Sequence, residues 1–150
     1  MCTHVRFRER RSEREFLFYN THLDHASQVA RMIGADLIVD HIAEAWRRYP
    51  LPTLLTGDMN ADPENPAVAA LSSERDGKRV LYDAYDWLRA QGGEVGATFH
   101  GFKGGTAGAP IDYILHSSHW RVEEVRVDRR SEGSRYPSDH YPVWGVFAAE

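Results

Sequence analysis

An acid and an imidazole stand side by side in the stretch YPSDHYPVW, residues 136–144. A carboxylate can bind a hard cation or orient an imidazole, and an imidazole can transfer a proton or stabilise an anion. The neighbouring Ser138 suggests a Ser-His-Asp triad. Members of such a triad converge from separate elements, however, whereas consecutive side chains point in different directions. We therefore expect the partners of Asp139 and His140 to lie elsewhere in the chain.

The apolar stretch PIDYIL, residues 110–115, contains one carboxylate, Asp112. In an extended strand its apolar neighbours would occupy the opposite face, and a buried carboxylate needs a partner. His140 is the obvious candidate, because an Asp that orients and charges an imidazole is a common catalytic pair. The alternative is a structural bond from Asp112 to a Tyr or to the backbone.

A second acidic stretch, TGDMNADP at residues 56–63, follows a short apolar run. Asp58 and Asn60 are separated by one residue, so an extended backbone would place both side chains on one side, where they could hold a water or an oxyanion. Gly57 permits a close backbone approach or an unusual dihedral angle. The alternative is a simple turn, since Asp, Asn and Pro are common turn residues.

His22 and His25 flank Asp24 in the stretch NTHLDH, residues 20–25. Such a cluster could bind zinc, although no paired spacing typical of zinc ligands accompanies it. His22, at the end of a strand, could instead donate to an anion. The other histidines outside these stretches are interpreted as surface or capping residues: His4, His41, His100, His116 and His119.

These stretches need a scaffold, and the hydrophobic pattern outlines one. Residues 3–8 and 15–20 predict a β-hairpin with a solvated, Arg-rich tip, for which a phosphate-binding patch is the alternative. A long helix is predicted over residues 26–48, ended by the prolines that follow it. Its predicted apolar stripe recurs at spacings of three and four residues: Val29, Ala30, Ile33, Leu37, Ile38, Ile42 and Ala45.

The rest of the chain predicts short elements. Residues 51–56 indicate a buried strand, residues 66–71 a short helix, and residues 81–89 an ambiguous segment that could form a third helix. Four further strands are expected in ATFHGF, PIDYILHS, WRVEEVRV and PVWGVFA. Mixed helices and strands, with the last third mostly strand, indicate an α+β protein built in layers.

Composition limits the classes of function. The 150 residues predict one domain spanning residues 1–150, and an apolar fraction of 42% is ordinary for a globular chain. A net charge of −4 gives no general basis for binding nucleic acid. With Cys2 alone an internal disulfide is excluded, and a reducing, cytoplasmic location is expected. The sequence has neither an apolar stretch long enough for a membrane span nor a signal region.

Taken in order, four stretches resemble the motifs of the magnesium-dependent endonuclease/exonuclease/phosphatase superfamily, whose members have the DNase I-like fold. NTHLDH is similar to its N-T-H-L-D motif, TGDMNADP to G-D-F-N, PIDYIL to R-I-D-Y-I and YPSDHYPV to S-D-H-x-P-V. TFHGFKG, at residues 98–104, is similar to the family stretch that precedes R-I-D-Y-I. The resemblance extends from about Thr3 to Phe147.

The resemblance implies a role for most polar residues of these motifs. Asp139 matches a carboxylate that binds the divalent metal, Mg²⁺ with Mn²⁺ as the alternative. His140 matches the imidazole that contacts the scissile phosphate, and Asp112 matches the acid that orients it. Asp58 and Asn60 match the pair that positions and activates the attacking water. A hard cation with oxygen ligands would polarise the phosphoryl group for in-line attack.

Two further matches and several departures complete the comparison with the family pattern. His22 matches a residue that stabilises charge on the phosphoryl oxygens, with Asn20 in support. The family domain is longer, and its first half carries an Asn and a metal-binding Glu that have no counterpart here. Pro110 replaces the usual basic residue before I-D-Y-I, and Met59 replaces the usual Phe.

The resemblance also implies a fold of two β-sheets packed face to face, with helices on both outer faces. This chain holds strands for about one sheet, so we expect a DNase I-like half-domain, mostly antiparallel, with helices on one face. A second copy, forming a homodimer, or another chain would complete the four-layer α/β/β/α sandwich. The expected activity is Mg²⁺-dependent hydrolysis of a phosphodiester or phosphomonoester, nucleic acid included. The alternative is an inactive remnant that binds phosphate-containing ligands or a partner chain.

Overall fold

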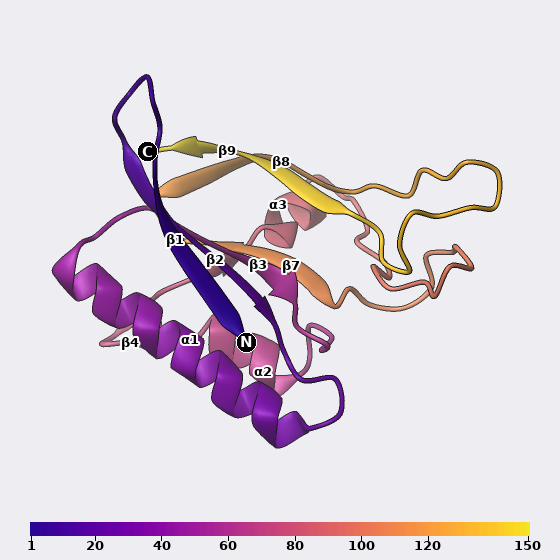
Figure 1. Ribbon diagram of the computed structural model, residues 1–150, viewed down its shortest axis with the longest axis horizontal. Coiled ribbons are helices and arrows are strands. Elements are labelled where there is room, and N and C mark those ends of the chain that lie inside the picture. The colour runs from indigo at the N-terminus through magenta and orange to yellow at the C-terminus, as the bar shows by residue number, and fades with distance from the viewer.

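A computed structural model describes all 150 residues of the chain (Figure 1). It contains three helices and nine strands, three of them only two residues long. In chain order the elements are β1 (Cys2–Arg8), β2 (Glu15–His22), α1 (Gln28–Arg48), β3 (Thr53–Asp58), α2 (Pro66–Leu71), β4 (Glu74–Arg75), β5 (Lys78–Arg79), β6 (Tyr82–Asp83), α3 (Tyr85–Ala90), β7 (Asp112–His116), β8 (Trp120–Val127) and β9 (Val143–Ala149). The predicted α+β class is confirmed.

The main sheet has five strands in the order β1-β2-β3-β7-β6. Only β2 and β3 run parallel, and the other neighbours are antiparallel, as the sequence predicts. A parallel pair needs a long crossover connection, which α1 supplies. Strands β8 and β9 form a separate antiparallel hairpin.

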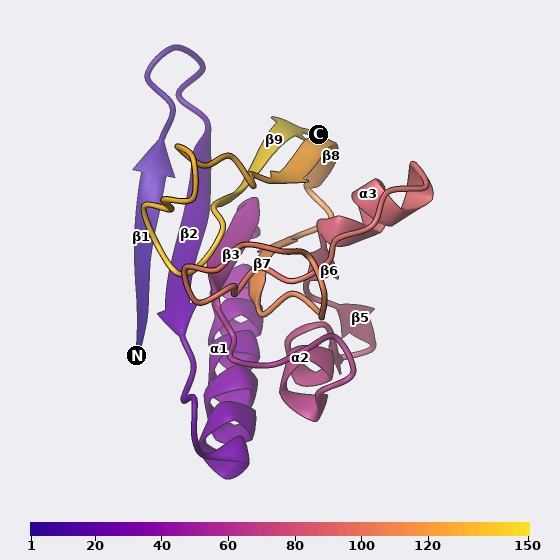
Figure 2. The same cartoon turned by 90° about the vertical axis from the view of Figure 1, so that its right-hand side faces the viewer.

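The elements stack in layers (Figures 1 and 2). Helices α1 and α2 cover one face of the main sheet, and the β8–β9 hairpin lies over part of the opposite face, with α3 packed against β8. Leu17 and Tyr19 of β2 and Leu55 of β3 point into the core shared with the helices, where each is almost fully buried. No helix has the length and apolar character required to cross a membrane.

Helix α1 begins after Ser27, whose side chain accepts a hydrogen bond from the backbone N–H of Ala30. Its buried face consists of Ala35, Ile38, Val39, Ile42 and Ala43. The predicted apolar stripe is therefore wrong in its first half, where every member is exposed: Val29, Ala30, Ile33 and Leu37. Apolar residues occupy more than one face of this helix, and their spacing alone does not decide which face meets the sheet.

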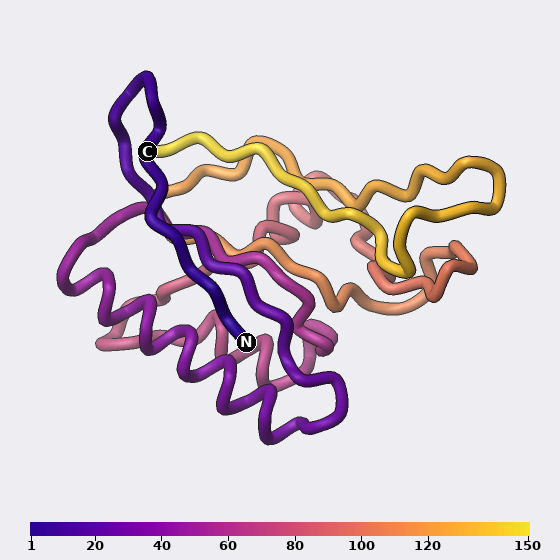
Figure 3. The backbone as a smooth tube through the Cα atoms, viewed as in Figure 1, coloured from indigo at the N-terminus to yellow at the C-terminus, as the bar shows by residue number.

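Two predictions in the second half of the chain need correction or completion. ATFHGF is not a strand: its only ladder contact is an isolated bridge between Phe99 and His140. Gly101 and Phe102 both have positive φ, 57° and 63°, which an extended strand does not allow. The ambiguous segment 81–89 divides into the short strand β6 and helix α3. The tube in Figure 3 shows that the loops before β7 and before β9 gather at one end of the molecule.

Part of the main sheet has no cover on the side opposite the helices. Val5 and Phe7 of β1 pair with Phe18 and Phe16 of β2, and Phe18 pairs with Leu54 of β3, so these side chains share one face. The Phe16 ring contacts Trp120 of β8, which places this face on the side of the β8–β9 hairpin. Beyond the hairpin, Val5 and Phe7 remain 49% and 45% exposed. We call these five residues the open apolar face.

Candidate active site

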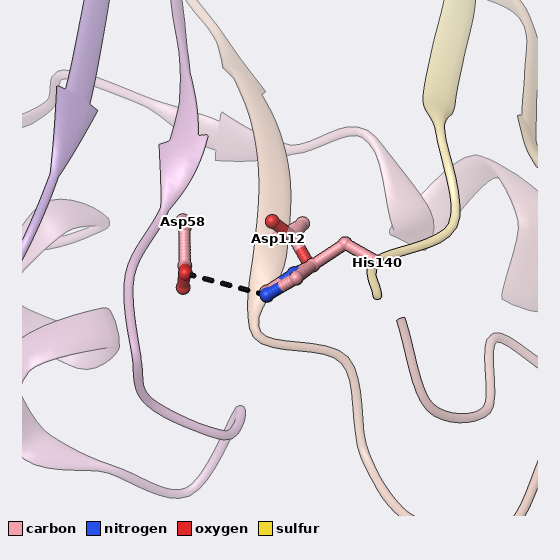
Figure 4. A group of neighbouring side chains, drawn as sticks. All are labelled: Asp58, Asp112 and His140. Atoms are coloured by element: carbon pink, nitrogen blue, oxygen red, sulfur yellow. Dashed lines mark hydrogen bonds and ion pairs between the residues drawn. The ribbon is translucent and has the colours of Figure 1, made fainter. Parts of the chain in front are cut away.

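Three titratable side chains converge at one end of the main sheet. Asp58, the last residue of β3, lies directly opposite Asp112, the first residue of β7. Figure 4 shows His140 reaching from the segment before β9 across Asp112 toward Asp58. One ligand atom from each of the three residues lies within 4.8 Å of the other two. The site is thus formed by the ends of two neighbouring strands of the main sheet and by the loop that leads into β9 of the β8–β9 hairpin.

Asp112 and His140 form the predicted hydrogen bond. Nδ1 of His140 lies 2.8 Å from Oδ2 of Asp112, and because a carboxylate only accepts, Nδ1–H is the donor. Nε2 is left facing Oδ2 of Asp58 at 3.9 Å. Burial alone would lower the pKa of His140, but the hydrogen bond and charge of Asp112, with the charges of Asp58 and Asp139, raise it above the usual value.

The backbone at Gly57 brings Asp58 to this position. Gly57 has a φ of +153°, and a Cβ built there would lie 1.9 Å from the carbonyl oxygen of Thr21 on the parallel strand β2. Only glycine can approach a neighbouring backbone so closely. The predicted close approach is therefore confirmed, and it seats the Asp58 carboxylate beside Asp112.

Asp58 and Asn60 do not lie on one side of an extended strand, so this part of the prediction is wrong. Asn60 has a φ of +47°, and its N–H donates to Oδ1 of Asp58 at 2.7 Å, which is the turn named as the alternative. The Asn60 amide donates to the carbonyl of Leu23 at 3.0 Å. Burial first, and then the charge of Asp112, raises the pKa of Asp58 despite its bond from Asn60.

His22 and Asn20 lie on the same face as Asp58, because the ends of β2 and β3 are in register. Nε2 of His22 is 3.5 Å from Oδ2 of Asp58, and the side chain is 69% exposed. The amide of Asn20 donates to the hydroxyl of Thr56 at 2.9 Å. A ligand at Asp58 would therefore also meet His22.

Asp139, Asp24 and His25 lie outside the group formed by Asp58, Asp112 and His140. Asp139 lies outside the group of three, and its carboxylate accepts only a 3.4 Å hydrogen bond from Ser138. Its role as a metal ligand stays a prediction. Asp24 accepts hydrogen bonds from the N–H groups of Ala26 and Ser27, and His25 belongs to no group of potential metal ligands. The zinc alternative is therefore not supported.

The donors present fit a divalent cation. Asp58 and Asp112 offer carboxylate oxygens, the ligands that Mg²⁺ and Mn²⁺ prefer, and His140 lies beside them. The two carboxylates are close enough for the charge of Asp112 to raise the pKa of Asp58. A cation between them would relieve this repulsion.

Sequence reasoning missed two residues around the pair. His100, predicted as a surface or capping residue, does not lie at the surface: it is only 8% exposed, stacks on Tyr141 with ring centroids 4.0 Å apart, and accepts a hydrogen bond from the N–H of Gly104 at 3.3 Å. Thr98 is fully buried and hydrogen-bonds to the backbone on both sides of the site. The TFHGFKG resemblance was the available signal, but no spacing rule predicts contacts between loops.

Comparison with known proteins identifies the class. Residues 2–140 match the endonuclease/exonuclease/phosphatase family over most of the chain. The chain belongs to this family. Among curated proteins, none matches it in sequence.

Several solved structures have the same fold. A mannosyl-6-phosphatase of Bacteroides thetaiotaomicron is 28% identical, with a TM-score of 0.82 over 98% of this chain and 56% of the other. A conserved protein of unknown function from Enterococcus faecalis is 26% identical, with a TM-score of 0.80 over 99% and 56%. The human Nocturnin catalytic domain with bound sulfate, at 22% identity, has a TM-score of 0.78 over 99% and 53%. The chain thus spans about half the length of these relatives.

Proposed function

We propose that this chain is a divalent-metal-dependent phosphoesterase. The observation that carries the proposal is the convergence of Asp58, Asp112 and His140 in a family of phosphate-ester hydrolases. Their two carboxylates and one imidazole offer what phosphoryl transfer requires: anionic ligands, a proton acceptor and a cationic donor. A bound Mg²⁺ or Mn²⁺ would supply Lewis-acid polarisation of a phosphoryl oxygen.

In this proposal each residue of the site has its own role. In its protonated form, which Asp112 favours, His140 donates Nε2–H to a phosphoryl oxygen and stabilises the charge that develops there. Asp58, whose pKa is raised, accepts a proton from the attacking water. The water oxygen bonds to phosphorus, the bond from phosphorus to the ester oxygen breaks, and the leaving alkoxide takes a proton from solvent. His22, 3.5 Å from Asp58, adds a donor for the same phosphoryl group. Asp139, whose carboxylate accepts only a 3.4 Å hydrogen bond from Ser138, would be a further ligand for the cation, and Asn60 holds Asp58 through its N–H.

Similarity to a known phosphatase and the net charge of the chain both bear on the class of substrate. The mannosyl-6-phosphatase, at 28% identity, supports a phosphomonoester of a small molecule. The net charge of −4 gives no reason to prefer long nucleic acid. We therefore propose a small phosphate ester as the substrate and treat DNA as the alternative.

The test is hydrolysis of bis-p-nitrophenyl phosphate, plasmid DNA and a panel of phosphomonoesters, each with Mg²⁺, Mn²⁺ or EDTA. We expect turnover of the small esters with metal and none with EDTA. Metal-independent turnover would contradict the proposal. No turnover at all, with phosphate perturbing the His140 resonances, would favour the inactive remnant.

We further propose that a second copy of the chain covers the open apolar face. Its members, Val5, Phe7, Phe16, Phe18 and Leu54, form a patch of the kind that monomers rarely leave in water. The relatives are nearly twice as long as this chain, so in them further structure is available for this role. A two-fold axis lets the same patch meet itself, and such interfaces bury about 2,000 Å² or more in total.

Light scattering coupled to size exclusion tests the homodimer at micromolar concentration. Phe7→Glu, on the open apolar face, should give a monomer. Val29→Glu is the matched control, since Val29 is exposed on α1 at the other side of the sheet. A monomeric wild type, or equal dissociation by both variants, would contradict the dimer, and a partner that carries the other half of the family domain would then be sought.

A further inference from the structure

We infer that Thr98 is a positioning residue that sets the geometry between Asp112 and His140. The inference rests on the proposed function, because this is the proposed catalytic pair. Thr98 is fully buried in the loop before β7. Its hydroxyl oxygen accepts hydrogen bonds from the N–H of Ile111 at 3.0 Å and of Asp112 at 3.2 Å. Its carbonyl accepts one from the N–H of Tyr141 at 2.7 Å.

The pair needs such a link because its two members belong to different sheets. Asp112 begins β7 of the main sheet, whereas His140 precedes β9 of the separate β8–β9 hairpin. No strand pairing joins β7 to β9. Thr98 bonds to the backbone of Asp112 itself and to the residue directly after His140. A single side chain and its own carbonyl thus fix both sides of the 2.8 Å hydrogen bond.

The residues that follow Thr98 make further contacts between this loop and residues 139–141. Phe99 forms a bridge with His140, and the two rings meet edge to face with centroids 5.0 Å apart. The N–H groups of His100 and Gly101 both donate to the carbonyl of Asp139, at 2.9 and 3.1 Å. The backbone of this loop is therefore hydrogen-bonded to residues 139–141. The hydroxyl of Thr98 connects the same loop to the start of β7.

Thr98→Val tests the role of the hydroxyl, because valine keeps the shape but cannot accept a hydrogen bond. The half-buried N–H groups of Ile111 and Asp112 would lose their partner, and the start of β7 would shift relative to His140. The 2.8 Å hydrogen bond from Nδ1–H of His140 to Asp112 should then lengthen, which moves the low-field proton resonance of this Nδ1–H upfield. Thr98→Ser keeps the oxygen and should show the wild-type resonance.

The measurement is the proton NMR resonance of the His140 Nδ1–H, assigned by comparison with His140→Gln. The matched control is Thr53→Val: Thr53 is equally buried, and its hydroxyl is bonded to Trp46 and Leu51, away from the pair. We expect an upfield shift or loss of this resonance in Thr98→Val alone. A folded Thr98→Val protein with the wild-type resonance, or an equal shift in Thr53→Val, would overturn the inference.

Hydrogen exchange of the wild type keeps the inference testable if Thr98→Val does not fold. The N–H groups of Asp112 and Tyr141 should be protected to the same degree, because both depend on Thr98. Rapid exchange at either one would overturn the inference. Neither measurement needs catalytic turnover. Both therefore still test the role of Thr98 if the chain proves to have no phosphoesterase activity. If the protein turns over, Thr98→Val should lower kcat more than it changes KM.

Discussion

Replacing Gly57 by alanine should damage the fold at the point that carries the site. The new Cβ would lie 1.9 Å from the carbonyl oxygen and 2.8 Å from the carbonyl carbon of Thr21. To remove this clash, β2 and β3 would have to separate by more than about 1 Å. That separation breaks the hydrogen bonds around Thr21, each of which contributes about 1 kcal/mol to stability. The positive φ of +153°, in a region that essentially only glycine adopts, adds about 1–3 kcal/mol. We expect a total loss of about 3–5 kcal/mol in the free energy of unfolding.

Gly77→Ala is the matched control for this prediction. Gly77 also has a positive φ, +71°, but a Cβ there would meet nothing within 4 Å. It should therefore cost only the conformational penalty, about 1–2 kcal/mol. Urea unfolding followed by tryptophan fluorescence measures both variants. If Gly57→Ala loses no more stability than Gly77→Ala, the close approach that we describe between β2 and β3 is wrong.

Three further predictions concern the site. Asp112→Asn should lower kcat/KM by about 10- to 150-fold, since it removes a charge-assisted hydrogen bond of about 1.5–3 kcal/mol, whereas Asp40→Asn on α1 should change little. The stability advantage of the wild type over His140→Gln should be fully present below about pH 6.5 and shrink as the pH rises through the raised pKa of His140; an advantage that grows with pH in denaturant melts would contradict this. Mg²⁺ should bind only in the millimolar range by titration calorimetry, because few acidic ligands are present; micromolar binding would require a further acidic ligand.

The sequence predicts elements where local chemistry decides the structure. Helix α2 and strand β8 have the predicted bounds, because a proline opens the helix and apolar alternation marks the strand. The buried face of α1 was mispredicted in its first half, since Val29 and Ile33 are apolar but lie away from the sheet. Local patterns show that a residue is apolar, and tertiary packing decides whether it is covered.

In the site, too, some features could be predicted from the sequence and others depend on tertiary contacts. The bond between Asp112 and His140 could be predicted, because a buried acid needs a partner and the ordered motifs supplied one. The turn at Asn60 depends on a positive φ that an extended reading of the stretch could not reveal. The burial of His100 arises from stacking on Tyr141 across two loops, and no spacing in the sequence encodes that contact.

The most direct test of the account is the rate of bis-p-nitrophenyl phosphate hydrolysis by the wild type and by His140→Ala, each with Mg²⁺ and with EDTA. His25→Ala serves as the control, because His25 is exposed and outside the group of Asp58, Asp112 and His140. We predict turnover only with Mg²⁺, a loss of at least about 100-fold in His140→Ala, and no change in His25→Ala. Equal rates with EDTA, or an unaffected His140→Ala variant, would contradict the assignment of this site.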